Sequence, residues 1–251
     1  MDLFYALDLK EREIISFVGG GGKTTLMFRL ADEIPNRYQT LITTTTKIFI
    51  PPADRYPTFT ANGNKFNEIE LKQFLQAGIK PVLGSGLLPE NKLSGLNQEQ
   101  FKNIAQWQEI EYILVEADGS KGRPLKGHLY FEPVIPQWTT MVIIVIGADA
   151  LGKPLDSDYV HRSEVVTELT GNRPGSVITP EIISKLITHS QGIMRSIPPL
   201  ARTTVIINKV DCLASLDEAY RTAQLLIGDL IEKVVLCSAI SKHPVVDVVY
   251  K

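Results

Sequence analysis

Short apolar runs alternate with amphipathic stretches along most of the chain. The apolar runs predict strands over residues 14–18, 40–43, 80–83, 112–116, 141–146, 203–207 and 234–237. Between the runs, apolar residues recur with helical spacing, which predicts helices over residues 23–34, 68–77, 98–107, 164–170, 180–188 and 216–227. Strands that alternate with helices are typical of an α/β protein with a mainly parallel central sheet.

Three further segments complete the predicted organisation. Residues 51–66 and 84–97 are rich in Pro, Gly, Asn and Ser, so they predict surface loops. Residues 147–199 lie between two predicted strands and carry helical patterns, which predicts a helical insertion. No stretch has the composition of a linker, and we expect one domain over residues 1–251.

Composition and charge narrow the class of protein. Hydrophobic residues make up 44% of the chain and charged residues 22%, which excludes wholesale disorder. The formal net charge of −2 favours neither nucleic acid nor an anionic membrane as a partner. No apolar run is long enough for a membrane span and the N-terminus lacks an export signal, so a cytoplasmic protein is expected. Cys212 and Cys237 are too few for a disulfide framework, and Cys237 is expected to be buried and inert.

A glycine-rich loop stands between the first predicted strand and the first predicted helix. Its residues are Gly19, Gly20, Gly21, Gly22, Lys23, Thr24 and Thr25. In a phosphate-binding loop, glycines let backbone N–H groups turn toward the phosphates, and the helix N-terminus adds its positive dipole end. Lys23 then reaches the β- and γ-phosphates, and the Thr24 hydroxyl ligates Mg²⁺. The match to G-x-x-x-x-G-K-[ST] is incomplete, since Phe17 occupies the first glycine position, and a plain flexible turn is the alternative. The placement favours a nucleotide site in a three-layer sandwich like that of the P-loop NTPases.

A second motif, Asn208-Lys209-Val210-Asp211, follows a later predicted strand. The Asp211 carboxylate is placed to accept hydrogen bonds from guanine, Asn208 to orient the base loop, and the Lys209 stem to cover the base. Ser238 and Ala239 follow the last predicted strand and resemble a Ser-Ala motif that contacts the guanine carbonyl. A polar turn is the alternative for each motif. Together they favour GTP, with ATP as the other candidate.

Two acids, Glu116 and Asp118, end the predicted strand over residues 112–116. The carboxyl end of a parallel strand faces the ligand site, where an acid can hold Mg²⁺ or orient an attacking water. Of the two, Asp118 is favoured, and with Thr24 it makes the predicted metal site. The predicted catalytic groups are therefore Lys23, Asp118 and Glu116.

Other candidate substrate residues flank these motifs. A basic loop after the acids could clamp an anionic substrate, although a solvated basic loop is an equal reading; its residues are Lys121, Arg123, Lys126 and His128. Thr45 and Lys47, after the second predicted strand, are placed to contact a γ-phosphate or Mg²⁺, although a β-branched continuation of the strand is an equal reading. The pair His161 and Arg162 is expected at the surface.

The motifs GGGGKTT, LITTTTKI, VEADGSKGRPLKGH, GADALGKPL and INKVD together resemble the YqeC family. The likeness extends from Phe17 to about Ala239. It implies a P-loop NTPase-like fold and an association with the maturation of selenium-dependent molybdenum hydroxylases. It also places the family's phosphate loop on residues 19–25, its acidic loop on residues 116–126 and its Asn-Lys-x-Asp motif on residues 208–211.

These patterns and the resemblance predict a slow, Mg²⁺-dependent GTPase that assists maturation of a selenium or molybdenum cofactor enzyme. Its expected partners are the nucleotide and a client hydroxylase or cofactor-handling protein. Two alternatives stay open: a small-molecule kinase with an anionic acceptor, and a nucleotide-gated binding protein without appreciable catalysis. A direct metal or selenium carrier is least supported, because the chain offers few soft ligands. The oligomeric state and the client do not follow from the sequence.

Overall fold

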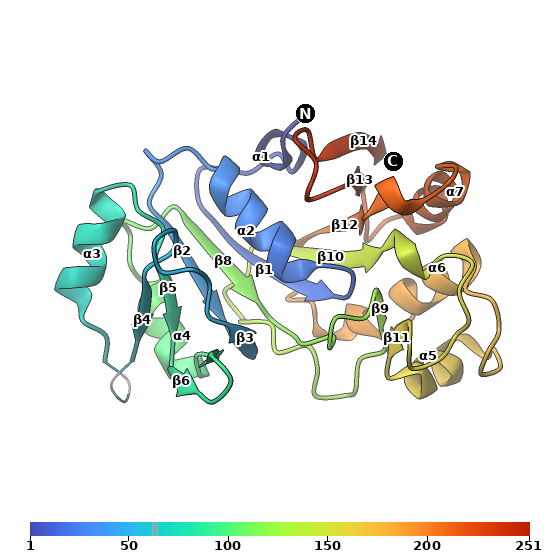
Figure 1. Cartoon of the computed structure of the whole chain (residues 1–251), viewed down its shortest axis with the longest axis horizontal. Coiled ribbons are helices and arrows are strands. Elements are labelled where there is room, and N and C mark those ends of the chain that lie inside the picture. The colour runs from blue at the N-terminus through green and yellow to red at the C-terminus, as the bar shows by residue number, and fades with distance from the viewer. Residues whose placement is uncertain (62, 64) are drawn as a thin grey trace.

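A long, mostly parallel sheet forms the centre of the computed structural model, which describes residues 1–61, 63 and 65–251 (Figure 1). The strands of this sheet are β1 (Glu13–Gly19), β2 (Thr40–Thr44), β4 (Thr58–Thr60), β5 (Val82–Gly84), β8 (Tyr112–Glu116), β10 (Met141–Gly147), β12 (Arg202–Asn208), β13 (Lys233–Cys237) and β14 (Val245–Tyr250). Among the described residues their order is β14-β13-β12-β10-β1-β8-β2-β5-β4. In the part of the chain that the structure describes, only the β13–β14 pair of this sheet is antiparallel.

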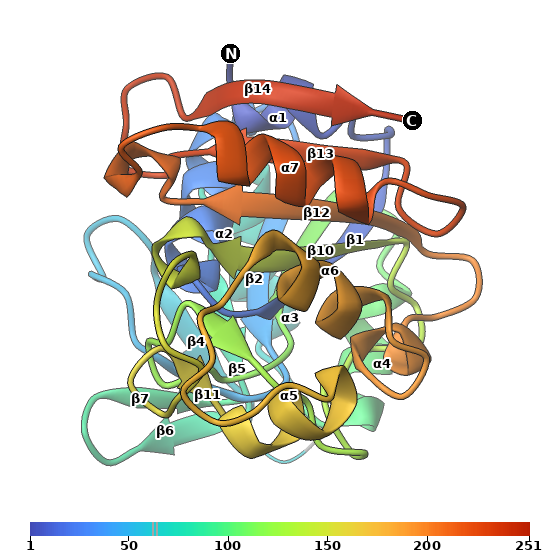
Figure 2. The same cartoon turned by 90° about the vertical axis from the view of Figure 1, so that its right-hand side faces the viewer.

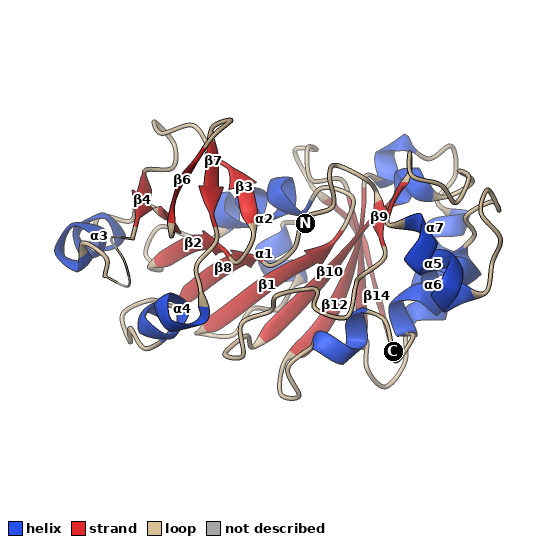
Figure 3. Cartoon of the chain, turned by 90° about the horizontal axis from the view of Figure 1, so that it is seen from below, coloured by secondary structure: helices blue, strands red, loops and turns tan. Residues whose placement is uncertain are grey.

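Two small sheets and a set of helices surround the central sheet. The antiparallel sheet consists of β3 (Lys47–Phe49), β7 (Lys92–Ser94) and β6 (Gly86–Leu88), and a parallel pair is formed by β9 (Leu125–Lys126) and β11 (Val160–His161). The α-helices are α1 (Leu3–Ala6), α2 (Lys23–Glu33), α3 (Glu68–Gln76), α4 (Gln98–Ala105), α5 (Ser163–Thr170), α6 (Pro180–Thr188) and α7 (Asp217–Leu226). Helices α5, α6 and α7 group at one end of the molecule and α3 lies at the other (Figures 1 and 3).

Side chains of the central strands belong to two separate hydrophobic clusters, one on each face of the sheet, because successive residues of a strand point to opposite faces. On one face, Ile15 and Phe17 of β1 pack in a cluster with apolar residues of α1 and α2. On the other face, Ile14 and Val18 pack in a cluster with apolar residues of α3, α4, α5, α6 and α7. Figure 2 shows α7 lying along β12 and β13 on this second face. Helices therefore cover both faces of the sheet, as the sequence predicts.

Helix α2 begins and ends at residues that the sequence marks. Gly22 precedes it with a left-handed φ of 106°, which a residue without a side chain adopts most readily. At the other end, Ile34 is extended before Pro35, since a residue that precedes proline is disfavoured in the helical region. The helix therefore starts directly at Lys23, next to the end of β1.

The predicted strands and helices are confirmed, with differences in the two segments predicted as loops. Residues 84–97 carry β6 and β7, and residues 51–66 carry β4, while positions 62 and 64 lie outside the described residues. The buried side chain of Leu93 joins the α2-side cluster, so one apolar residue secures β7 although its flanks are polar. The short strand β3, the edge strand β14 and helix α1 are also absent from the prediction.

The segment 147–199, predicted as a helical insertion, is helical over part of its length. It contains α5, α6, two short 3₁₀ helices and the strand β11. Ile183 and Leu186 of α6 are buried in the same cluster as the sheet residues Val142 and Ile144. The segment therefore packs on the sheet through a shared core. No helix in the described part of the chain has both the length and the apolarity that a bilayer crossing needs.

Candidate functional site

The predicted motifs lie at one edge of the central sheet. Strands β1, β2, β8, β10, β12 and β13 are parallel neighbours, so their carboxyl ends point the same way. In the register of the sheet, Phe17 of β1 and Thr44 of β2 both pair with Glu116 of β8. The glycine loop and the acidic loop therefore leave the sheet side by side.

The glycine loop is packed directly against other backbone. Gly19, Gly21 and Gly22 have φ values of 97°, 77° and 106°, which side-chain-bearing residues rarely adopt. A Cβ atom on Gly21 would lie 2.1 Å from the backbone nitrogen of Gly147 at the end of β10. A Cβ on Gly20 would lie 2.7 Å from the carbonyl oxygen of Arg123. Glycine is thus required here for both conformation and close approach.

Part of the loop's hydrogen-bonding capacity is already used. The first three glycine amides donate, in chain order, to Asp118 Oδ2 at 3.0 Å, to the Val145 carbonyl at 2.9 Å and to the Arg123 carbonyl at 3.0 Å. In the described part of the chain, the amides of Gly22 and Lys23 have no hydrogen-bond acceptor. These unpaired amides lie where the loop meets α2. Helix N-termini with unpaired amides attract anions, so this point is suited to an anion.

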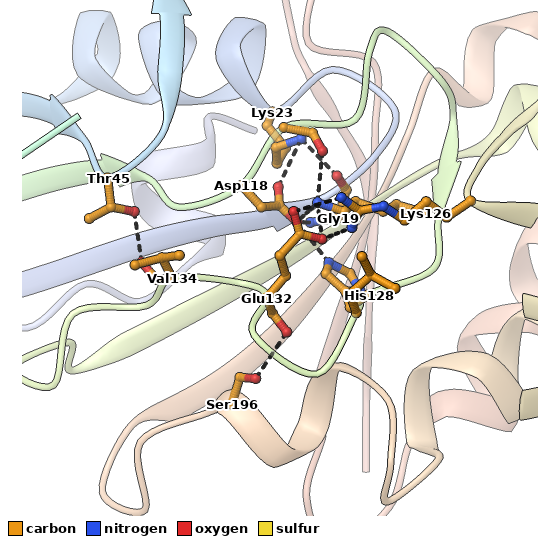
Figure 4. Close-up of polar contacts among 12 residues, drawn as sticks. Gly19, Lys23, Thr45, Asp118, Lys126, His128, Glu132, Val134 and Ser196 are labelled. Atoms are coloured by element: carbon orange, nitrogen blue, oxygen red, sulfur yellow. Dashed lines mark hydrogen bonds and ion pairs between the residues drawn. The ribbon is translucent and has the colours of Figure 1, made fainter. Parts of the chain in front are cut away.

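Asp118 is enclosed by positive and hydrogen-bonding groups (Figure 4). Lys23 Nζ lies 3.1 Å from Asp118 Oδ1 and donates to the Gly19 carbonyl at 2.7 Å. Asp118 Oδ2 is 2.7 Å from His128 Nε2 and 3.4 Å from Lys126 Nζ. Burial alone would raise the pKa of Asp118, but the charge of Lys23, the hydrogen bond from His128 and the charge of Lys126 hold that pKa well below its usual range. Burial lowers the pKa of His128 despite Asp118, so its imidazole is neutral near pH 7.

Lys126 connects the acidic loop to the segment 147–199. Its side chain is fully buried, donates to the Gly119 carbonyl at 2.7 Å and lies 3.3 Å from Glu132 Oε2. Burial lowers the pKa of Lys126 to about 8, although Asp118 opposes this shift. Arg162 in turn donates to Glu132 Oε1 at 3.1 Å. Arg162, predicted as half of a surface pair, has a side chain that is 21% exposed, and its guanidinium is engaged in this ion-pair chain.

Glu116, not Asp118, is the acid next to Thr24. The Thr24 hydroxyl donates to Glu116 Oε2 at 2.6 Å, and the Glu116 side chain is buried. Burial raises the pKa of Glu116, and the Lys23 charge and the Thr24 hydrogen bond oppose this shift. A hydroxyl and a carboxylate side by side form a donor set that Mg²⁺ uses together with phosphate and water oxygens. The geometry therefore favours Glu116 over Asp118 as the partner of Thr24 in a metal site.

No cluster of three or more His, Cys, Asp or Glu side chains suited to a metal ion occurs among the described residues. The pair of Thr24 and Glu116 thus fits a cation only when a bound ligand or water supplies further oxygens.

A cleft of about 860 Å³ opens beside the glycine loop. Its walls come from the start of α2, the threonine loop after β2 (Thr45 and Thr46), strands β3 and β7 of the small sheet, and the acidic loop. The residues that matter for its chemistry are Lys23, Thr24, Thr25, Thr45, Lys47, Phe49, Lys92, Glu116 and Lys121. Three of the predicted substrate residues, Thr45, Lys47 and Lys121, therefore line one cleft.

The other three candidates, Arg123, Lys126 and His128, do not line this cleft. Lys126 is buried in β9, which pairs with β11, and it does not reach the cleft. Arg123 lies 3.8 Å from Asp158 of the segment 147–199. Lys92 and Phe49 take part in the cleft instead, with Lys92 Nζ 5.1 Å from the centroid of the Phe49 ring. The sequence prediction missed Lys92 because it lies in a segment whose composition predicts a loop.

Asn208 ties three motifs together. Its side chain is buried, with Nδ2 donating to the Gly21 carbonyl at 2.8 Å and Oδ1 accepting from the Ala239 amide at 3.0 Å. The glycine loop, the end of β12 and the Ser-Ala segment are therefore held as one unit. Lys209 has a left-handed φ of 63° and its Nζ lies 2.7 Å from Asp149 Oδ2.

Asp211 and Ser238 occupy different environments near this tie. Asp211 is exposed in a short 3₁₀ helix over residues 210–212. Ser238 is buried and its amide donates to the Pro244 carbonyl at 2.7 Å. Cys237 is fully buried, and burial raises the pKa of its thiol to about 12, in agreement with the prediction of an inert residue.

The chain is similar to known sequences over most of its length. A family model described as YqeC protein matches residues 15–164, a range that includes the glycine loop, the threonine loop and the acidic loop. A protein of Escherichia coli (strain K12) described as "Uncharacterized protein YqeC" is 32% identical over 201 residues, which cover 80% of this chain and 77% of the relative. On both matches, this chain belongs to the YqeC family.

Proposed function

We propose that this protein is a P-loop-type, Mg²⁺-dependent nucleotide-binding protein that prefers GTP and hydrolyses it slowly. The observation that carries the proposal is the meeting of Lys23, Thr24, Glu116 and Asp118 at the carboxyl ends of two adjacent strands, beside a cleft. Ligands of α/β proteins bind in the crevice outside these strand ends. A polyphosphate placed there meets unpaired amides and a lysine ammonium.

The phosphates are the part of the nucleotide that the geometry accounts for most directly. The unpaired amides of Gly22 and Lys23 and the N-terminus of α2 suit one anionic group. Lys23 is held beside Asp118 at 3.1 Å, so its ammonium is already oriented toward the loop. We assign Asp118 a positioning role for Lys23, since a carboxylate with such a low pKa is a poor proton acceptor.

Mg²⁺ would be held by Thr24 and Glu116, and it would supply positive charge to the phosphate oxygens. Glu116 keeps its carboxylate near this position through the 2.6 Å hydrogen bond from Thr24. No enclosed base aimed at an attacking water is identified among the described residues. Slow turnover is therefore expected, since positioning and charge carry most phosphoryl-transfer chemistry and a partner can complete the site.

The preference for GTP rests on the second motif. Asn208 is fixed by the glycine loop on one side and by Ala239 on the other, which supports a base site next to the proposed phosphate site. The exposed Asp211 carboxylate is free to accept the two donors on the guanine edge, a pair that adenine does not offer. ATP is the competing ligand that the experiment must test.

The cellular role is proposed from the family alone. The YqeC resemblance associates the chain with the maturation of selenium-dependent molybdenum hydroxylases, so the proposed client is such an enzyme or a protein that handles its cofactor. Nucleotide binding or hydrolysis would then control a step of that maturation.

The first experiment titrates the purified protein with GTP and with ATP in the presence of Mg²⁺. Tighter binding of GTP is expected, and Asp211→Ala should remove the preference by about 1–3 kcal/mol, the cost of an unpaired polar partner. Lys23→Ala should abolish binding of both nucleotides, while Asp54→Ala, at another exposed acid, should change neither affinity. Equal affinities for the two nucleotides in the wild type would contradict the base assignment, and unchanged GTP affinity in Lys23→Ala would overturn the phosphate site.

A small-molecule kinase is the second candidate, and the shape of the cleft favours it. The cleft continues past the phosphate loop to Lys47, Lys92 and Lys121, three cations that could hold an anionic acceptor. Consumption of nucleotide that requires an added acceptor would support the kinase. Tight binding without product in a single-turnover assay would instead support the nucleotide-gated binding protein.

A further inference from the structure

A second cavity, distinct from the nucleotide cleft, lies on the other side of the threonine loop. Its volume is about 420 Å³, within the range of small-molecule binding sites. We name it the Trp138 cavity. Its apolar lining residues are Leu96, Phe101, Val134, Ile135, Pro136 and Trp138.

The chemistry of the lining indicates the class of ligand. As described, the lining contains no acidic, basic or histidine side chain, so a charged group would enter without a compensating partner. Trp138 is partly exposed and stacks on the buried ring of Phe101 with ring planes 15° apart, so Trp138 contributes the accessible aromatic face. Gln98 and Gln137 add exposed side-chain amides without a hydrogen-bond partner in the described residues. This combination suits a flat, uncharged ring system with donors or acceptors at its edge.

The two cavities share a wall at the phosphate end of the cleft. Thr45 and Gly95 line both of them. A Cβ atom on Gly95 would lie 2.3 Å from the carbonyl carbon of Thr45, so the two backbones are in direct contact. The Thr45 hydroxyl donates to the Val134 carbonyl at 2.7 Å, across this wall (Figure 4).

Val134 also connects the Trp138 cavity to the acidic loop. Its amide donates to the carbonyl of Ala117, the residue between Glu116 and Asp118, at 3.1 Å. Two positions earlier, Glu132 belongs to the ion-pair chain with Lys126. A ligand that contacts Val134 therefore contacts a segment that is hydrogen-bonded both to the acidic loop and to the threonine loop.

From this arrangement we propose that the Trp138 cavity binds a neutral, planar, fused-ring heteroaromatic molecule, and that its occupancy changes the affinity of the adjacent cleft for its ligand. The binding part is independent of the nucleotide, whereas the coupling part rests on the proposed function.

The test uses the full chain with Trp107→Phe, which leaves Trp138 as its single tryptophan, since the sequence has two. Quinazolin-4-one serves as the neutral planar probe, 4-oxoquinazoline-2-carboxylate as the charged analogue and caprolactam as the non-planar neutral amide. Saturable quenching of Trp138 emission by quinazolin-4-one is expected, with at least about tenfold weaker binding of the other two probes. Equal binding of all three would overturn the assigned ligand class, and an absence of saturable quenching would overturn the site.

Two variants locate the binding and separate it from the nucleotide. Ile135→Phe fills the cavity and should weaken quinazolin-4-one binding about tenfold or more, while Ile69→Phe on the exposed face of α3 should not change it. Undiminished binding to Ile135→Phe, with an unchanged melting temperature, would place the probe elsewhere and overturn the proposal. Lys23→Ala should bind quinazolin-4-one with the affinity of the parent protein. Loss of nucleotide binding in that variant therefore does not affect the test of the cavity.

Coupling is measured by titrating GTP with and without saturating quinazolin-4-one. A change of about fivefold or more in GTP affinity is expected, and GTP must change the probe affinity by the same factor. Probe binding that leaves the GTP affinity unaltered would refute the coupling. A protein that binds the probe but no nucleotide would refute the proposed function and leave the cavity assignment in place.

Discussion

Replacement of Asn208 by alanine should destabilise the protein even without a ligand. The side chain is 2% exposed, and its amide group makes the 2.8 Å bond to the Gly21 carbonyl and the 3.0 Å bond to the Ala239 amide. Truncation leaves both backbone groups buried without this partner. A net loss of about 1 kcal/mol per hydrogen bond, with up to about 3 kcal/mol for each unsatisfied group, gives an expected cost of about 2–4 kcal/mol.

This cost is measured by urea denaturation of wild type and Asn208→Ala in nucleotide-free buffer. In a chain of this size, about 3 kcal/mol corresponds to a fall of about 6–12 °C in the melting temperature. Asn36→Ala, at an exposed asparagine, is the control and should stay within about 0.5 kcal/mol of wild type. A loss below about 1 kcal/mol in Asn208→Ala would refute the reasoning, because the tie between the glycine loop and Ala239 would then carry no stability.

Three further outcomes follow from the site. The pKa of Lys126 falls from its ordinary 10.5 to about 8 on folding. Between these pH values the unfolded chain therefore binds more protons than the folded chain. The free energy of unfolding should rise with pH across this range by about 3 kcal/mol. Urea denaturation at several pH values should show this rise in wild type and lose it in Lys126→Met; parallel curves would contradict it. Glu116→Gln should raise the Mg²⁺ concentration for half-maximal GTP binding about tenfold in a Mg²⁺ titration at fixed GTP. An unchanged Mg²⁺ concentration would remove Glu116 from the proposed metal site. Gly22→Ala places a Cβ 2.8 Å from Asn208 Nδ2 at a left-handed φ and should cost about 2 kcal/mol in urea denaturation, whereas Gly175→Ala, left-handed but in open space, should cost about 1 kcal/mol. Equal losses in the two glycine variants would show that contact with Asn208 is unimportant.

The main elements of the fold could be predicted from the sequence because each carries its own periodic signal. The run Met141 to Ile146 is apolar at every position, as expected for a strand buried on both faces, and it forms most of β10. The strand β7 has no such signal. It is held by one buried leucine, Leu93, and by pairing with β3 and β6, and neither feature is visible in a local window.

In the candidate site, the residues of each motif were easier to predict from the sequence than the contacts that their side chains make. The glycine loop and Asn208 could be singled out from their residue types and their positions after strands. The assignment of Asp118 as the partner of Thr24 could not be decided, because Glu116 and Asp118 lie two residues apart and face different groups. The packing of Lys126 and His128 around Asp118 helps to separate the two acids, and basic residues in a glycine-punctuated loop look the same in sequence whether buried or solvated.

The glycine loop is held at two points: Asp118 accepts the amide of Gly19, and Asn208 donates to the carbonyl of Gly21. Glycine-rich segments ordinarily retain the largest backbone entropy of any sequence, and most of that entropy has been lost here when the chain folds. Binding of an anion to the unpaired amides therefore requires little further ordering of the loop backbone. Its association should show a small entropic penalty in calorimetry, and the cost of ordering four glycines falls on the folding equilibrium instead.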